Sequence, residues 1–200
     1  MSEHYYSQTQ KVESNPKTWS FTLRNRSFRF KTDNGVFSKG DVDYGSKLLI
    51  ETFEIPESQG DLLDVGCGYG PIGLSMASIM EDRTIHMVDV NTRALGLAKE
   101  NAELNAIKNV RIYESDKLEG VKGNKFAAIL TNPPIRAGKK TVHEIFEQSY
   151  DCLIKGGELW VVIQKKQGAP SAIEKLEQLF SEVETVVKKK GYFILKGKKD

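Results

Sequence analysis

The stretch Asp61-Leu-Leu-Asp-Val-Gly-Cys-Gly-Tyr-Gly70 decides the fold of this 200-residue chain. Residues 61–65 form a short apolar run, as in a strand that is buried on both faces of a sheet, and three glycines follow at alternate positions. Pro71 comes next and suits the first position of a helix, because its missing N–H would be unpaired there anyway. A buried strand, a glycine turn and a helix in this order predict a parallel α/β sheet whose ligand binds beyond the strand ends.

Strand and helix patterns continue to alternate on the C-terminal side of this stretch. We expect helices at 44–53, 71–80, 91–105, 140–153 and 170–180, and strands at 61–65, 84–89, 110–113, 126–130, 158–163, 183–187 and 192–195. The last two strands are joined by Lys188-Lys-Lys-Gly191, which is too short for a crossover helix, so they must be antiparallel. The sequence predicts an α/β fold with a seven-stranded, mostly parallel sheet that ends in an antiparallel hairpin.

Residues 1–43 are rich in aromatic residues and turn formers. Phe21-Thr-Leu-Arg24 and Phe28-Arg-Phe-Lys31 alternate apolar with polar or basic residues on either side of Asn25-Arg-Ser27, which predicts a β-hairpin. Its apolar face should cover the main core, and its basic face is either solvated or in contact with nucleic acid. We therefore expect an N-terminal extension, 1–43, packed on a larger domain, 44–200.

Composition excludes several classes of protein. The net charge of +2 argues only weakly for a polyanionic partner, and two isolated cysteines suit a reducing compartment. The three histidines lack metal-ligand spacing, so we expect no metal. Residues 1–17 are polar, unlike a signal peptide, and no apolar run is long enough for a bilayer. We expect a cytoplasmic protein with no membrane partner.

The glycine loop matches two known patterns. Gly68-Tyr-Gly-Pro-Ile-Gly73 satisfies the G-x-G-x-x-G string of dinucleotide-binding proteins, but that register places Gly73 inside the helix. The spacing of Asp64, Gly66, Gly68 and Gly70 instead resembles motif I of class I methyltransferases, which bind S-adenosylmethionine and release S-adenosylhomocysteine. The resemblance implies that the glycine backbone lies against the methionine part and the ribose.

The same resemblance implies roles for three aspartates. Asp64 would serve the cationic end of the cofactor, Asp89 the ribose hydroxyls and Asp116 the adenine amino group, although each could be only a helix or turn cap. Lys155-Gly-Gly157 resembles the late glycine turn of the family, or a plain helix stop. The implied cofactor-binding set is Asp64, Gly66, Cys67, Gly68, Gly70, Asp89, Val90, Asp116 and Asn132.

Thr131-Asn-Pro-Pro134 directly follows the fourth expected strand. Pro-Pro is a common loop breaker, but Asn-Pro-Pro at this strand end resembles the motif of methyltransferases that act on exocyclic or amide nitrogens. An aryl NH2 is a poor nucleophile because its lone pair is delocalised into the ring. The Asn132 side-chain oxygen and the Pro133 carbonyl could accept its two N–H groups and direct the lone pair at a methyl group. We expect the catalytic residues to be Asn132, Pro133 and Pro134.

Position 135 departs from the wider pattern. The residue after Asn-Pro-Pro is often an aromatic that stacks on the target base, and here it is Ile135, which has no π-face. Phe37, Tyr44 and Tyr69 are the candidates for stacking, and the residues themselves do not decide among them. The target base should have to be unpaired or flipped out of its helix.

A second block, Gly35-Val-Phe-Ser-Lys-Gly-Asp-Val-Asp-Tyr-Gly-Ser46, resembles the small-subunit ribosomal RNA guanine-N2 methyltransferases of the RsmC type. His4-Tyr-Tyr6 also fits that group, whose longer members carry an extra degenerate copy of the domain. The resemblance implies guanine N2 of 16S ribosomal RNA, or the assembled small subunit, as the partner. Clustered cations after the fourth and fifth strands would suit its phosphates: Arg136, Lys139, Lys140, Lys165 and Lys166. The implied substrate-binding set is Phe37, Ser38, Ile135, Arg136 and Lys139.

Rival functions remain open at this stage. A protein glutamine N5-methyltransferase acting on a translation factor would share Asn-Pro-Pro, because a carboxamide nitrogen poses the same problem. A DNA adenine methyltransferase usually carries a recognition insert for which this chain has no room. A nicotinamide-dependent oxidoreductase would explain the glycines alone, and a non-catalytic RNA-binding module would explain the basic residues alone. The oligomeric state cannot be read from the residues.

Overall fold

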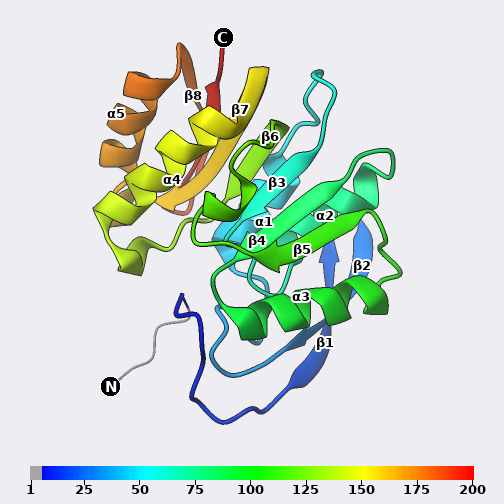
Figure 1. Ribbon diagram of the computed structural model, residues 1–200. Helices are drawn as coiled ribbons and strands as arrows, with labels where there is room; N and C mark the ends of the chain where they lie inside the picture. Colours follow the sequence, from blue (N-terminus) through cyan, green and yellow to red (C-terminus); the bar gives the residue numbers. More distant parts are fainter. Residues whose placement is uncertain (1–5) are drawn as a thin grey trace.

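A computed structural model describes residues 6–200 and contains one large sheet, a small hairpin and helices on both sides of the sheet (Figure 1). The seven strands lie in the order β5-β4-β3-β6-β7-β9-β8. They are β3 (Leu62–Val65), β4 (Ile85–Asp89), β5 (Val110–Glu114), β6 (Phe126–Thr131), β7 (Leu153–Gln164), β8 (Glu182–Lys189) and β9 (Tyr192–Lys198). The helices are α1 (Tyr44–Thr52), α2 (Pro71–Ile79), α3 (Thr92–Leu104), α4 (Lys139–Cys152) and α5 (Ala169–Leu179). The expected seven-stranded α/β fold is confirmed.

The strand order reverses beside β3. From β3 the chain runs outward through β4 to β5, then returns to place β6 on the other side of β3 and β7 beyond it, all in parallel. β9 pairs antiparallel with both β7 and β8, as the short connection required. The carboxyl ends of β3 and β6 therefore flank a topological switch point, where open α/β sheets leave a crevice for a ligand.

Successive residues of the strands face opposite layers, so the sheet separates two hydrophobic cores. Leu62, Met87 and Leu130 face the core under α1, α2 and α3. Leu63, Val88 and Ile129 face the core under α4 and α5. A sheet covered on both faces needs apolar residues at every strand position, which is why the sequence shows continuous apolar runs there.

The N-terminal hairpin consists of β1 (Lys17–Leu23) and β2 (Arg26–Thr32), and β2 packs against α3 (Figure 1). Its turn is Arg24-Asn25, with φ of 48° and 61°, one residue before the expected Asn25–Ser27 turn. Two positive φ values are what a tight hairpin turn requires. Leu23, Phe28 and Phe30 join the core of the larger domain, as expected. Whether residue 43 is a true domain boundary stays a prediction.

The basic residues of this hairpin are largely engaged within the fold. The Arg24 guanidinium donates to the carbonyls of Ile50 (2.8 Å) and Phe53 (2.9 Å) at the end of α1. Lys31 pairs with Glu100 of α3 at 2.5 Å. These contacts satisfy helix carbonyls and carboxylates, so they favour a structural role for the basic residues over contact with nucleic acid.

The expected glycine turn at 155–157 is wrong in detail. β7 begins at Leu153, directly after α4, and residues 155–157 lie within it. Gly156 has φ of 78°, and the pairing with β6 shifts register at this point, so the glycine forms a bulge and the strand continues beyond it. Within residues 6–200, the helices are all too short or too polar to span a membrane.

Candidate active site

A cavity of about 420 Å³ opens at the switch point, beyond the carboxyl ends of β3, β4, β5 and β6. It brings together most of the residues that the sequence selected for cofactor and target. Those that line it are Gly66, Cys67, Gly68, Asp89, Val90, Asp116, Asn132, Pro133, Pro134, Phe37 and Ser38. Asp64, Gly70, Ile135, Arg136 and Lys139 do not line it.

The glycine loop is held by the main chain of the neighbouring strand. The N–H groups of Gly66 and Cys67 both donate to the Val88 carbonyl at 2.9 Å, and the Gly68 N–H donates to Asp89 Oδ2 at 2.8 Å. Gly66 and Gly68 have φ of 73° and 57°, and a Cβ at either position would meet no protein atom within 4 Å. The loop therefore presents bare backbone to the cavity, which allows a bound molecule to approach closely.

Gly70 and Gly73 do not share this role. Gly70 is the N-cap of α2 and Gly73 lies inside the helix, as the sequence predicted. A Cβ on Gly73 would come within 2.6 Å of the Met87 side chain, and one on Gly70 within 2.9 Å of Leu74. Both glycines let α2 pack closely on β4, so they shape the cavity from behind.

Asp64 is buried, with 1% of its surface exposed, behind the glycine loop. Its Oδ2 accepts the Gly73 N–H at 2.8 Å at the start of α2, while no hydrogen-bond partner reaches Oδ1 among the described residues. Burial raises the pKa of Asp64 to about 7, the Gly73 hydrogen bond lowers it and the nearby Asp89 raises it further. Asp64 thus caps α2 from within the sheet, and the cavity wall hides it from a direct contact.

Asp89 ends β4 and both closes the loop and faces the cavity. Its two oxygens accept the N–H groups of Gly68 (2.8 Å) and Asn91 (2.9 Å). Burial raises its pKa, although backbone N–H groups of Asn91, Gly68 and Val90 lower it. A carboxylate offers about four lone-pair positions, so these backbone bonds leave acceptor capacity for a hydroxyl group of a ligand. The neighbouring Cys67 thiol has a pKa raised by burial, so it lines the cavity as a neutral group.

Asn132 stands at the tip of β6, and its side-chain amide has a defined orientation. Its Nδ2 donates to Asp43 Oδ2 and to Ser46 Oγ, both at 3.0 Å. Asp43 is the N-cap of α1, and both partners line the same cavity as Asn132. The sequence analysis did not select Asp43 or Ser46 as site residues. Their place in the Gly35–Ser46 block, at helix-capping spacing, was the signal that could have found them.

Three predicted substrate residues after Asn-Pro-Pro lie outside the main cavity: Ile135, Arg136 and Lys139. Pro134 leads into a 3₁₀ turn, Ile135–Ala137, in which Ile135 packs against the core under α4. Ile135 and Lys139 instead line a second cavity of about 100 Å³ between α4 and the start of α5. Arg136 is exposed, and its carbonyl accepts from the Tyr6 hydroxyl at 3.4 Å. The structure therefore does not place Ile135 where it could contact a base in the main cavity.

The three candidate stacking aromatics occupy different environments. Tyr44 lies outside the cavity and packs on Tyr192, with ring centroids 5.3 Å apart. Tyr69 lines the cavity but is only 2% exposed, because Trp19 and Phe30 cover its ring. Phe37 lines the cavity and is 42% exposed, so it is the candidate best placed to meet a base. Tyr6 also lines the cavity, whereas His4 and Tyr5 lie outside the described residues.

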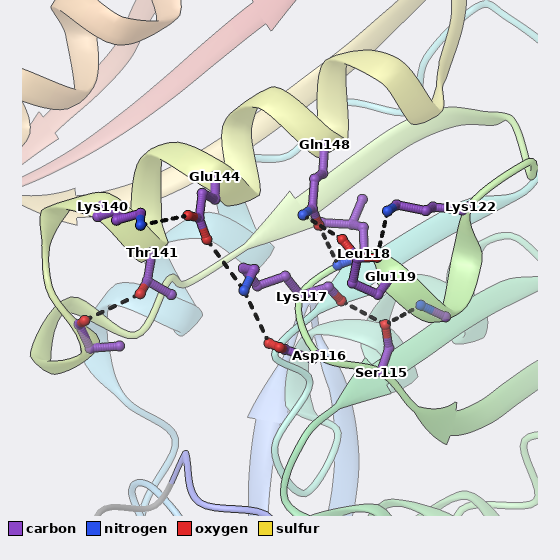
Figure 2. A network of polar contacts seen from close by, with 12 residues as sticks. Ser115, Asp116, Lys117, Leu118, Glu119, Lys122, Lys140, Thr141, Glu144 and Gln148 are labelled. Carbon is purple, nitrogen blue, oxygen red and sulfur yellow. Dashed lines mark hydrogen bonds and ion pairs between the residues drawn. The ribbon is translucent and has the colours of Figure 1, made fainter.

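A polar network joins the loop after β5 to α4 beside the cavity (Figure 2). Lys117 lies between Asp116 and Glu144, 3.3 Å from an oxygen of each, and Glu144 also pairs with Lys140. Burial lowers the pKa of Lys117, but its hydrogen bonds to the two carboxylates outweigh this and raise it. The loop that carries Asp116 is thereby tied to the helix that follows the Asn-Pro-Pro tip. No cluster of metal-ligating side chains occurs in the described part of the chain.

Comparisons with known proteins agree on one family. The model of the methyltransferase small domain matches residues 27–196. The uncharacterized protein YbxB of Bacillus subtilis is 66% identical over the full length of both chains. Ribosomal RNA small subunit methyltransferase C of Vibrio parahaemolyticus is 32% identical over 92% of this chain and 53% of its own length. The chain thus spans about half the length of the methyltransferase C relatives that it matches.

Solved structures share the fold. The 16S rRNA N2 G1207 methyltransferase RsmC of T. thermophilus, in complex with AdoMet and guanosine, superposes with a TM-score of 0.83 at 24% identity, over 96% of this chain and 52% of its own. A methyltransferase from Pyrococcus furiosus superposes with a TM-score of 0.68 at 23% identity, over 83% of this chain and 90% of its own. The matched model, the related sequences and the shared fold together show that this chain belongs to the methyltransferase small domain family.

Proposed function

We propose that this protein transfers a methyl group from S-adenosylmethionine to guanine N2 of small-subunit ribosomal RNA. The observation that carries the proposal is that one cavity is lined both by the glycine loop and by Asn132. Gly66 and Gly68 present backbone without side chains to it, and Asn132 offers a side-chain oxygen that can accept a hydrogen bond. A methyl donor on the first and an amino group on the second would lie within one pocket. Neither a nicotinamide site nor a passive RNA-binding surface requires that pairing.

The residues present fit S-adenosylmethionine. A side chain at Gly66 or Gly68 would occupy the space beside the loop backbone in which the methionine part and the ribose of the ligand would lie. Asp89 keeps acceptor capacity for a ribose hydroxyl, and Asp116 lies further along the same wall for the adenine amino group. Asp64, behind the loop, holds the Gly73 N–H at the start of α2 and so supports the loop without touching the ligand. When bound, S-adenosylmethionine supplies an electrophilic methyl group on a sulfonium.

The protein's contribution to the reaction is the grip on the amino group. Asn132 Oδ1 and the Pro133 carbonyl accept its two N–H groups and draw the nitrogen toward tetrahedral geometry, with the lone pair toward the donor. The two prolines limit backbone motion, so little reorganisation accompanies the reaction. Alignment of the reacting atoms supplies most of the acceleration, and the surplus proton leaves the nitrogen after transfer.

Three findings support ribosomal RNA as the substrate. The relatives at about 30% identity are named for methylation of small-subunit ribosomal RNA. Phe37 is exposed at the cavity and can stack on a flipped base. Arg136, Lys139, Lys165 and Lys166 are exposed in the segments that follow β6 and β7. These cations suit phosphate contacts, which position RNA without reading its sequence. Such a substrate implies action in the cytoplasm, on free RNA or on the assembled subunit.

The test is methylation of unmodified 16S RNA and of small subunits with labelled S-adenosylmethionine, followed by nucleoside mass spectrometry. We expect N2-methylguanosine from the wild-type protein and none from Asn132→Ala, with cofactor affinity unchanged in calorimetry. The proposal would be overturned by label only in protein, by a different nucleoside, or by full turnover of Asn132→Ala.

A further inference from the structure

We propose that Asp43 and Ser46 are positioning residues that set the orientation of the Asn132 amide, so that its oxygen, and not its NH2 group, faces the target amino group. The inference rests on the proposed function and adds a device to it. The two residues belong to the first turn of α1, and they lie 89 and 86 positions from Asn132 in the chain.

An amide must be fixed to serve as an acceptor. The two ends of an asparagine side chain have nearly the same shape, and rotation by 180° would exchange oxygen for NH2. An NH2 group facing the substrate's NH2 would set donor against donor and could not draw out the lone pair. The reaction therefore requires the protein to choose between two orientations that backbone packing hardly distinguishes.

Asp43 makes that choice unambiguous. An ionised carboxylate only accepts hydrogen bonds, so its Oδ2, 3.0 Å from the Asn132 amide, must face the nitrogen. Ser46 Oγ takes the second N–H at 3.0 Å. Both N–H groups of the amide are thus consumed on the α1 side, and Oδ1 is left for the cavity that all three residues line.

The two partners are themselves held. Asp43 Oδ2 also accepts the backbone N–H of Ser46 at 3.0 Å, and the Asp43 carbonyl accepts from Lys47, so the residue is a regular helix cap. Ser46 is only 6% exposed. Gly45 lies between them because a Cβ there would come within 3.0 Å of Asp43 Oδ2 and 2.8 Å of the Tyr192 ring. The Asp-x-Gly-Ser spacing thereby builds a rigid bracket for Asn132.

The first test compares Asp43→Ala and Ser46→Ala with wild type. Asp43→Ala removes the oxygen that accepts from both Asn132 Nδ2 and the Ser46 N–H, and Ser46→Ala removes the second acceptor of the amide. The lost helix cap should cost about 1 kcal/mol of stability. We expect kcat for RNA methylation to fall on the order of 30-fold in the first and 5-fold in the second, equivalent to about 2 and 1 kcal/mol. KM for the cofactor and its calorimetric affinity should stay within twofold. Asp41→Ala, which removes the same charge two residues earlier at an exposed side chain, is the matched control and should keep the wild-type kcat.

A direct readout is the Asn132 side-chain NH2 resonance in ¹⁵N-labelled protein, assigned by its loss in Asn132→Ala. In wild type the two protons should be shifted and slow to exchange, because both are hydrogen-bonded. In Asp43→Ala they should move toward the free-amide position, because one of their two acceptors is gone. An unchanged resonance in that variant would overturn the inference without reference to any turnover.

The decisive test is a swap. Asn132→Asp alone sets two carboxylates face to face and should lower kcat on the order of 100-fold. Adding Asp43→Asn can turn an NH2 donor toward the new carboxylate, at the cost of the bond from the Ser46 N–H to the same atom. The pair leaves an oxygen for the cavity and should recover at least tenfold of the lost kcat. Failure of the swap to recover activity, with Asp43→Ala at the wild-type kcat, contradicts the positioning role alone. Full activity of Asn132→Ala would sink the proposed function as well, so the two failures are distinguishable.

Discussion

The two sides of the cavity are positioned in different ways. The glycine loop after β3 is held by main-chain atoms of the adjacent strand, with Gly66 and Cys67 bonded to Val88 and Gly68 bonded to Asp89. The tip at Asn132 is held by side chains of α1, far away in sequence, which fix the direction of a single amide. A loop of the first kind depends on backbone geometry, and a tip of the second kind depends on exact side-chain partners. Changes on the first side should therefore alter cofactor binding, and changes on the second should alter turnover.

The largest expected effect concerns the glycine loop. Gly68→Ala adds a Cβ that points into open cavity space and forces a residue with a side chain to hold φ of 57°. We expect cofactor affinity to fall on the order of 100-fold, or about 3 kcal/mol, because the ligand can no longer approach the backbone. Calorimetry with S-adenosylmethionine measures this directly.

Gly123→Ala is the matched control for that change. Gly123 also has a positive φ, 91°, and open space around its Cβ, but it does not line the cavity. Both variants should lose about 1 kcal/mol of stability from backbone strain, and only Gly68→Ala should lose affinity. Equal cofactor affinity in the two variants would show that the backbone at Gly68 does not determine cofactor binding.

The next effect is a pH dependence of stability from Asp64, which supports the glycine loop from behind. Because burial raises its pKa to about 7, the folded protein holds a proton that the unfolded chain releases near pH 4. The contribution to stability is therefore present at low pH and is lost as pH rises through 7. Between pH 5 and 8 it amounts to about 2 kcal/mol.

Chemical denaturation at several pH values checks this expectation. Asp64→Asn should flatten the fall in unfolding free energy between pH 5 and 8, whereas Asp82→Asn, at an exposed carboxylate, should keep the wild-type slope. The slope is the relevant measure, because a buried asparagine NH2 also lowers stability at every pH. Parallel curves for wild type and Asp64→Asn would contradict the assignment.

A smaller effect tests the network that joins the two sides. Lys117→Met removes the ion pairs with Asp116 and Glu144 at a side chain that is 19% exposed. We expect a loss of about 1 kcal/mol and a cofactor affinity reduced less than tenfold, since such pairs are worth little when water reaches them. Lys122→Met, which loses only the surface pair with Glu119, should lower stability by at most about 0.5 kcal/mol. A larger loss of stability in Lys122→Met than in Lys117→Met would contradict the role of Lys117 in joining the two sides of the cavity.

The smallest expected effect concerns a residue that lies on neither side of the cavity. Gly96 lies in the interior of α3, is exposed and has nothing within 4 Å of its Cβ position. Gly96→Ala should stabilise the protein by about 0.5 to 1 kcal/mol, because alanine loses less backbone freedom in a helix. Thermal unfolding should show a higher midpoint, with cofactor affinity and kcat both unchanged.

The amino-acid sequence by itself determined the sheet, its antiparallel end, the start of α2 at Pro71 and the meeting of a glycine loop with an Asn-Pro-Pro tip. Each depends on neighbours along the chain, such as apolar periodicity, the φ of proline or the length of a connection, together with the rule that parallel strands end at one edge.

Only the tertiary structure decided where individual side chains point. It turned Asp64 behind the loop and Ile135 into the opposite core, and it brought Asp43 and Ser46 to Asn132. Strand and helix patterns state which face a residue occupies, but a hydrogen bond between α1 and β6 depends on how the helix docks on the sheet. That docking is set by packing over the whole core, and no short stretch of sequence predicts this packing.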